Sequence, residues 1–171
     1  MRIRPAALPD IPEIQAIYAH HVLTGTGTFE EVPPSVEEMA ARFATLTDAG
    51  AIWRVAADAT GVLGYAYAAR YHTRSAYRFT AEDSVYVRDD RRGCGVGRAL
   101  LAELVAAATA AGFRQMLAVI GDSANVGSIA LHRDAGFTEA GRLLAVGYKF
   151  GGWRDVVLMQ RALGEGDTTP P

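Results

Sequence analysis

The residues whose types and spacing point most directly to chemistry lie in the stretch VYVRDDRRGCGVGRALL, residues 85–101. Three glycines alternate with other residues there, and arginines stand on both sides of them. Glycine is costly inside regular structure, so three in alternation indicate a backbone that something approaches closely. At a helix start, such a loop presents unpaired N–H groups and a partial positive charge. Arginines are otherwise unfavourable at a helix start, so their clustering predicts a bound diphosphate.

Two familiar nucleotide-binding motifs do not fit this glycine loop. A P-loop needs Gly, four residues and then Gly-Lys-Ser/Thr, and the chain has no such run. A dinucleotide fingerprint would place its third glycine at position 98, which is Arg98. A tight strand-to-helix turn, with glycine for backbone geometry alone, is the remaining alternative to an anion site. The flanking arginines favour the anion site.

The cysteine and histidine content indicates neither a thiol nucleophile nor a metal centre. Cys94 is the only cysteine, which excludes an internal disulfide and a cysteine-based zinc site. No histidine adjoins it in the loop to activate the thiol, so we interpret Cys94 as a small loop residue. His20 and His21 point to different faces of a helix, which defeats a two-ligand site. We therefore expect no metal.

Length and composition limit the remaining function classes. The 171 residues suit one domain with a sizeable core. With 17 basic and 19 acidic side chains and a pI near 6.1, the chain has no general electrostatic reason to bind nucleic acid. Arg2, Arg4 and Pro5 interrupt the opening and no apolar run is long enough to span a membrane, so we expect a cytoplasmic protein without a membrane partner. We expect residues 1–163 to form the domain and 164–171 a mobile tail.

The stretches around the glycine loop alternate between helix and strand patterns. Apolar residues at helical spacing, or in short runs between turn residues, mark the elements. Ser35 and Glu38 form a capping box at the start of the second helix. We predict helices within 8–22, 35–46, 97–113 and 125–137, and strands at Ile3, 52–58, 62–71, 80–90, 114–120 and in a final pair within 145–163 turning at Gly151 and Gly152. This order predicts a mixed α/β (α+β) domain with strand, helix, strand at its centre.

The loop RRGCGVG resembles the cofactor signature of the GNAT N-acetyltransferase superfamily, Arg/Gln-x-x-Gly-x-Gly/Ala. The preceding strand SVYV and the long helix that follows match the family's context. The segments RSAYRFTAEDSVYV, AVIGDSANVGSIALHRDAGF and VGYKFGGWRDVVLMQR look like its phosphinothricin and methionine-sulfoximine acetyltransferase branch, and the resemblance runs from Ile3 to about Leu163. It implies the GNAT fold, a mixed central sheet with two splayed parallel strands and flanking helices.

The resemblance also implies that acetyl-CoA lies between the splayed strands DSVYV and RQMLAVI. Its pantetheine arm would pair with free backbone groups of Val85 and Val87, as an added strand would, while its diphosphate meets the glycine loop. Asn125 matches an asparagine that contacts the pantetheine in relatives, and it can also cap its helix. The residues assigned to the cofactor are Val85, Tyr86, Val87, Arg92, Gly93, Cys94, Gly95, Val96, Gly97, Arg98 and Asn125.

Direct acetyl transfer needs a neutral amine and a proton for the departing thiolate. Glu82 resembles the family's proposed base, acting directly or through water, provided that burial raises its pKa; the alternative is an exposed strand glutamate. His132 occupies the position of a proton donor in this branch, and histidine can donate near neutral pH. A helix histidine that only packs or caps is the alternative interpretation, with Tyr148 as the other candidate donor.

The acceptor would be a small amino-acid analogue, of the phosphinothricin, methionine-sulfoximine or methionine-sulfone kind, acetylated on its α-amine. Such substrates are anionic, so their pocket needs cations and hydroxyls. Arg74 and Tyr77 match the branch's substrate segment, and Thr26 and Phe29 match its first-loop wall, although each could be a surface residue. A protein or peptide N-acetyltransferase and a non-catalytic acyl-CoA-binding module are the competing functions. A homodimer, through first-loop and final-hairpin aromatics, is a family expectation.

Overall fold

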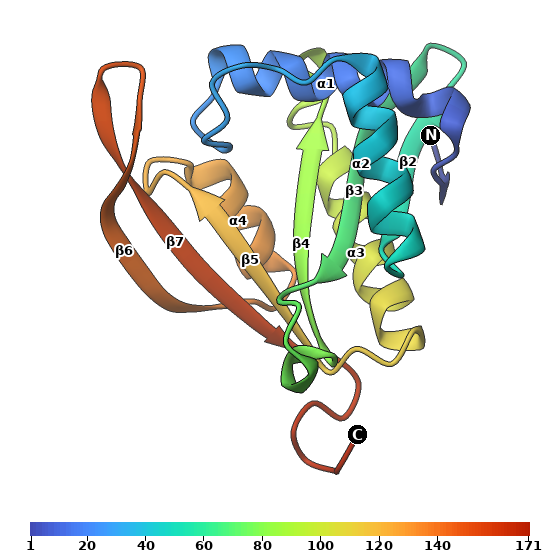
Figure 1. The fold of residues 1–171 in the computed structure, drawn as a ribbon, viewed down its shortest axis with the longest axis vertical. Helices are drawn as coiled ribbons and strands as arrows, with labels where there is room; N and C mark the ends of the chain where they lie inside the picture. Colours follow the sequence, from blue (N-terminus) through green and yellow to red (C-terminus); the bar gives the residue numbers. More distant parts are fainter.

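The structure is a computed structural model that describes residues 1–171 throughout. Seven strands form one mixed sheet in the order β1-β2-β3-β4-β5-β7-β6, with α1 and α2 on one face and α3 and α4 on the other (Figure 1). The elements are β1 (Arg2–Pro5), α1 (Ile11–Thr24), α2 (Val36–Asp48), β2 (Ile52–Asp58), β3 (Gly61–Arg70), β4 (Thr80–Val87), α3 (Val96–Ala110), β5 (Gln115–Gly121), α4 (Val126–Asp134), β6 (Thr138–Lys149) and β7 (Gly152–Ala162), with short 3-10 helices η1 (Leu8–Asp10), η2 (Ser75–Tyr77) and η3 (Asp89–Arg91). The mixed α/β prediction is confirmed. None of the helices is both long and apolar enough to span a membrane.

Two strand boundaries differ from the predicted ones. β4 ends at Val87 rather than at 90, because residues 89–91 turn into η3. β6 begins at Thr138, seven residues before the predicted start of the final strand pair, and residues 138–144 are mostly exposed. Their sequence lacks the alternation of a half-buried strand, so only pairing with β7 reveals them as one.

Local sequence signals set two of the boundaries that position the site. The Ser35 hydroxyl accepts from the Glu38 N–H at 3.1 Å and the Glu38 carboxylate accepts from the Ser35 N–H at 2.7 Å, so the predicted capping box is confirmed. The final hairpin turns at Phe150 and Gly151, which both have positive φ, and Gly152 already belongs to β7. This corrects the predicted turn at Gly151 and Gly152, because a two-residue turn of this kind needs positive φ at both central positions.

A hydrophobic core lies on each face of the sheet. On one face α3 buries Leu100, Leu101 and Leu104 completely against the strands. On the other, Ile14 of α1 packs near Trp53, which stacks on neighbouring tyrosines of β3. Each such side chain contributes roughly 1.5–3 kcal/mol through burial. The two cores hold β3 and β4 firmly between the helix layers.

β4 and β5 pair only over the first half of their length. Their parallel register runs from Thr80↔Gln115 to Asp83↔Ala118 and then stops. β4 continues to Val87 against β3, while β5 continues to Gly121 against β7. The two strands therefore part after Asp83, as the resemblance implied, and this parting creates the site.

The C-terminal residues 164–171 lie beside Arg114. The Arg114 guanidinium donates to the Thr169 hydroxyl and to the Pro170 carbonyl, each at 3.2 Å. The mobility of this tail, and the boundary of the domain at residue 163, stay predictions.

Candidate active site

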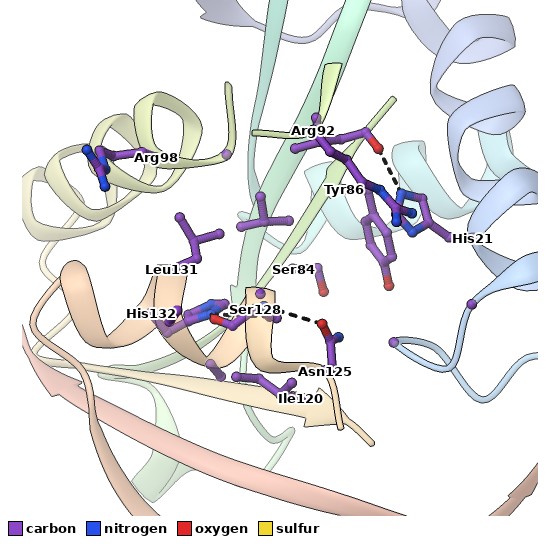
Figure 2. Close-up of a pocket in the computed structure, with 18 of the residues that line it drawn as sticks. His21, Ser84, Tyr86, Arg92, Arg98, Ile120, Asn125, Ser128, Leu131 and His132 are labelled. Atoms are coloured by element: carbon purple, nitrogen blue, oxygen red, sulfur yellow. Dashed lines mark hydrogen bonds between the residues drawn. The ribbon is translucent and has the colours of Figure 1, made fainter. Parts of the chain in front are cut away.

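A cleft of about 740 Å³ opens where β4 and β5 part. Its walls are the second halves of both strands, the glycine loop with the start of α3, one side of α4, and residues 25–27 after α1. Figure 2 shows Asn125, Ser128 and His132 on α4, facing Tyr86 of β4 and His21 of α1 across this space. The cleft is lined by both polar and apolar residues, so it can contact a ligand that has polar and apolar parts.

Nearly all of the predicted cofactor residues meet at this cleft. Cys94 is the exception: it is exposed, and its thiol lies 3.6 Å from the Arg92 carbonyl. The predicted residues that line the cleft are Val85, Tyr86, Val87, Arg92, Gly93, Gly95, Val96, Gly97, Arg98 and Asn125, together with Thr26 and His132. The Asn125 side chain accepts from the Ser128 N–H at 3.3 Å, so Asn125 caps α4 while lining the cleft.

The glycine loop leaves the start of α3 without a capping side chain. Gly93 and Gly95 have φ of +72° and +80°, a conformation that favours glycine, and Gly95 is the N-cap of α3. The first turn contains no acidic residue, so nothing in the chain offsets the unpaired N–H groups and the positive end of the helix dipole. Arg98 pairs with Asp134 at 3.1 Å in an exposed position. The loop is therefore suited to an anion.

The β4 edge that faces the cleft is only partly free. The Tyr86 carbonyl points toward β3, so the main-chain groups of Val85 and Val87 point into the cleft. His21 Nε2 lies 2.9 Å from the Val87 carbonyl and donates to it, because a carbonyl can only accept. The Val87 carbonyl thus already has one donor, and the pairing of Val85 and Val87 with a cofactor stays a prediction. Burial, the largest effect, lowers the pKa of His21, which favours the neutral ring.

Glu82 lies on the face of β4 opposite to Asp83, toward α1 and α2. Its side chain is partly buried and does not line the cleft. Burial, and then the charge of Asp83, raise the pKa of Glu82. A raised pKa is the condition that a base for an ammonium requires, and the catalytic role of Glu82 stays a prediction.

His132 is held by a hydrogen bond on each ring nitrogen. Nδ1 lies 2.7 Å from the Ser128 carbonyl, and Nε2 lies 3.0 Å from Asp83 Oδ2. The Asp83 and His132 side chains are 0% and 4% exposed. Burial lowers the pKa of His132, but the hydrogen bond and charge of Asp83 and the Ser128 carbonyl raise it by more. Tyr148, the other candidate donor, is exposed on β6 and does not line the cleft.

The first loop is tied to β6 by Lys149, the only lysine in the chain. Lys149 is 1% exposed, and its ammonium donates to the carbonyls of Gly25 and Thr28, both at 2.8 Å. Burial lowers the pKa of this ammonium. The Phe29 ring fills the space over Gly147, where a Cβ would not fit. Lys149 and Phe29 thus shape the loop that forms one wall, while Phe29 itself lies outside the cleft.

The predicted substrate residues Arg74 and Tyr77 are not at the cleft of this chain. They belong to the connection around η2, at the end of β4 remote from the glycine loop (Figure 1). Tyr77 is exposed, and its ring lies 5.6 Å from that of Tyr71 and 5.2 Å from that of His72. A role for this segment in substrate binding stays a prediction.

Sequence reasoning does not find the roles of Asp83 and His21 in this cleft. A signal for Asp83 exists, because strand alternation places it in one row with Ala81, Val85 and Val87, and a carboxylate among apolar residues needs a partner. His21 likewise falls on the buried stripe of α1. Neither partner could be named, because His132 and the Val87 carbonyl are distant in sequence.

Residues 3–158 match the acetyltransferase (GNAT) domain family. The match covers most of the chain, and the fold and the cleft agree with it. The chain belongs to the GNAT acetyltransferase family, which confirms the predicted resemblance.

Within this family, the chain is similar to acetyltransferases that are named for particular amino-acid analogues. A phosphinothricin N-acetyltransferase of Alcaligenes faecalis is 56% identical over 162 residues, covering 95% of this chain and 82% of the relative. An L-methionine sulfoximine/L-methionine sulfone acetyltransferase of Pseudomonas aeruginosa is 42% identical over 169 residues, 98% of each chain. The crystal structure of a phosphinothricin acetyltransferase from Sinorhizobium meliloti in complex with AcCoA superposes with a TM-score of 0.96 at 51% identity, covering 99% of this chain and 92% of that one.

Replacing Lys149 by Met should destabilise the protein, because two carbonyls of the first loop lose their buried donor. We expect the free energy of unfolding to fall by about 1–3 kcal/mol, the cost of leaving buried polar groups without partners. Urea unfolding followed by tryptophan fluorescence measures this. Arg142→Met removes an exposed cation from the same strand and serves as the control, with a change below about 0.5 kcal/mol. Equal losses in the two variants would contradict the role of Lys149.

Proposed function

We propose that this enzyme transfers acetyl from acetyl-CoA directly to the α-amine of a small amino-acid analogue, of the phosphinothricin, methionine-sulfoximine or methionine-sulfone type. The observation that carries the proposal is the cleft between β4 and β5, with an open strand edge along one side and an uncapped helix start at its mouth. The names of the relatives, and the AcCoA in a structure of the same fold, support the choice of donor and acceptor.

The residues of the cleft fit acetyl-CoA. The diphosphate is anionic, and the glycine loop offers it main-chain N–H groups with Arg92 nearby. The pantetheine amides can pair with Val85 and with the Val87 N–H, in the way an added strand pairs with a sheet edge. His21 donates to the Val87 carbonyl, whose second lone pair stays available to the arm.

The reaction needs a base for the substrate ammonium and a proton donor for the leaving thiolate. Glu82 accepts the proton of the substrate ammonium, directly or through water, and its raised pKa suits that exchange. The neutral amine nitrogen attacks the acetyl carbonyl, this nitrogen then loses a second proton to water, and the tetrahedral intermediate expels the thiolate. His132 lines the cleft while Tyr148 does not, which favours His132 as the proton donor. The proposal includes no metal.

Fewer residues of the cleft can be assigned to binding the acceptor substrate than to binding acetyl-CoA. Thr26 lines the cleft, and Phe29 supports the same loop through Gly147. Arg74 and Tyr77 would supply the cation and hydroxyl for the acceptor's anionic groups.

We place the enzyme in the cytoplasm, where Cys94 stays reduced. We assign it no nucleic-acid or membrane partner, since a protein with a pI near 6.1 has no general electrostatic attraction to nucleic acid.

We further propose that the chain forms a homodimer through the β6–β7 hairpin. β6 is an edge strand of the sheet, and an exposed edge is open to pairing with another chain. The hairpin carries several large apolar side chains that are exposed in the single chain, which we define as the hairpin patch. The patch comprises Leu143, Leu144, Val146, Tyr148, Phe150 and Trp153. A second copy would cover the edge and the patch together.

A thiol-release assay with acetyl-CoA tests the reaction. Phosphinothricin, methionine sulfoximine and methionine sulfone should be acetylated, and a peptide panel should not. Glu82→Gln should lower kcat by on the order of 10²-fold, because the ammonium loses its proton acceptor. Glu103→Gln removes a half-exposed carboxylate on α3 that faces Arg54, and it should leave kcat unchanged. Turnover on peptides alone, or acetyl-CoA binding without turnover of any amine, would sink the proposal.

The diphosphate site can be tested at Gly95. An aspartate there places a negative charge at the helix start in a backbone conformation with φ +80°, so the KM for acetyl-CoA should rise by about tenfold or more. Gly112→Asp is the matched control, because Gly112 has φ +90°, equally open surroundings and a position at the far end of α3. It should cost stability without changing KM. Similar KM values for acetyl-CoA in the two variants would contradict an anion site at the glycine loop.

Introducing charged residues into the β6–β7 hairpin tests the proposed dimer. Leu144→Arg combined with Trp153→Arg should convert a dimer into a monomer, because two cations in the interface cannot be paired. Light scattering after size exclusion measures the mass. Leu8→Arg, which adds the same charge at an exposed residue of η1, should leave the dimer intact. A wild type that is already monomeric at micromolar concentration would refute the proposal.

A further inference from the structure

The Asp83–His132 pair occupies the apex of the cleft, where β4 and β5 make their last contact. Asp83 forms the final register pair with Ala118, and both Asp83 and His132 line the cleft. The pair joins residues 49 positions apart in the sequence. It is therefore a contact that the fold creates at the closed end of the site.

The hydrogen bonds determine how many protons the pair holds. His132 Nδ1 lies 2.7 Å from the Ser128 carbonyl, which can only accept, and 3.4 Å from the Ser128 hydroxyl, so the shorter contact places a proton on Nδ1. The 3.0 Å contact between Nε2 and Asp83 Oδ2 needs a second proton between the two atoms. Asp83 Oδ1 is buried and has no partner, so nothing else balances the charge of this carboxylate. The second proton belongs on Nε2, which makes the pair an imidazolium and a carboxylate.

No other charged group competes for this histidine. β5, which packs against α4, contains no titratable residue. On α3, Arg98 faces Asp134 and Glu103 faces Arg54. The Phe137 ring meets the His132 ring edge-on at 5.1 Å. Asp83 from β4 is thus the one charged partner that faces His132 from a neighbouring element.

We propose that Asp83 is a positioning residue that keeps His132 doubly protonated at neutral pH, so that His132 begins each reaction cycle as an acid. This inference rests on the proposed function and deepens it. A histidine held on both nitrogens has no free lone pair, so it cannot act as the base for the amine. The base must therefore be another group, which agrees with the role given to Glu82.

The proton transfer balances as follows. When the tetrahedral intermediate collapses, the carbon–sulfur bond breaks and its electron pair stays on sulfur. Sulfur takes the proton held between Nε2 and Asp83, and the electrons of the N–H bond become a lone pair on Nε2. The neutral histidine then lies beside an unbalanced buried carboxylate, which favours its recharging from solvent. The proton lost by the amine replaces the one consumed.

The pH dependence of kcat tests the role of Asp83. With His132 as the acid, kcat falls as pH rises through the raised pKa of His132. In Asp83→Asn only the Ser128 carbonyl still opposes the effect of burial on His132, so this descent should move to lower pH by about one unit or more, with a loss at pH 8 about tenfold larger than at pH 6. Adding Asp83→Asn to His132→Asn should cause no further loss, because the residue acts through His132.

Two further variants separate positioning from folding. Asp83→Glu keeps the charge and should restore part of the activity at pH 8. Asp10→Asn breaks a different part-buried pair, with Arg4 at 2.6 Å, far from the cleft, so it should lower stability without moving the pH profile. A uniform loss of kcat at every pH in Asp83→Asn would overturn the proposal.

Nitrogen-15 NMR of the histidine rings gives a readout that needs no turnover. Of the four histidines, the signal that His132→Asn removes should report both ring nitrogens as protonated at pH 7 in wild type. In Asp83→Asn the same ring should be neutral at that pH. A neutral His132 in wild type would overturn the inference even if acetylation occurs. If wild type acetylated no amine, the proposed function would fail, and this spectrum alone would decide the protonation of His132.

Discussion

The parting of β4 from β5 after Asp83 is the constraint on which the rest of the site depends. Two strands that diverge inside a sheet leave main-chain groups without ladder partners, and buried groups of that kind are costly unless something satisfies them. His21 satisfies one, the Val87 carbonyl, from α1. The others form an edge to which an extended ligand can bind. The cleft is therefore a gap in the hydrogen bonding of the sheet, held open by helices on both faces.

The two ends of this cleft differ in electrostatic character. At the mouth, the start of α3 has neither a capping side chain nor an acidic residue, so its positive potential is available to an anion. At the apex, Asp83 and His132 form a buried hydrogen-bonded pair. Lys149 holds the loop between them with hydrogen bonds to two carbonyls. A ligand with anionic phosphates and a neutral thioester fits this polarity from one end to the other.

The amino-acid sequence predicted the class of fold and most of one wall of the cleft because those signals are local. The alternating glycines, the helix that follows and the capping box at Ser35 each lie within a few residues of one another. The acceptor side was harder to predict. Arg74 and Tyr77 lie away from the cleft of this chain, and Phe29 packs on Gly147 behind its loop, because the pairing of distant segments sets their positions.

The sequence by itself determined the glycine loop at a helix start, the order of helices and strands, and the membership of the GNAT acetyltransferase family. Only the tertiary structure decided which side chains complete the cleft. Asp83 meets His132 across 49 positions, His21 meets Val87 across 66, and Lys149 meets Gly25 across 124. Hydrophobic periodicity and turn residues predict only how residues close together in the sequence are arranged. A buried charge or carbonyl takes its partner from whatever element the sheet and helices bring beside it.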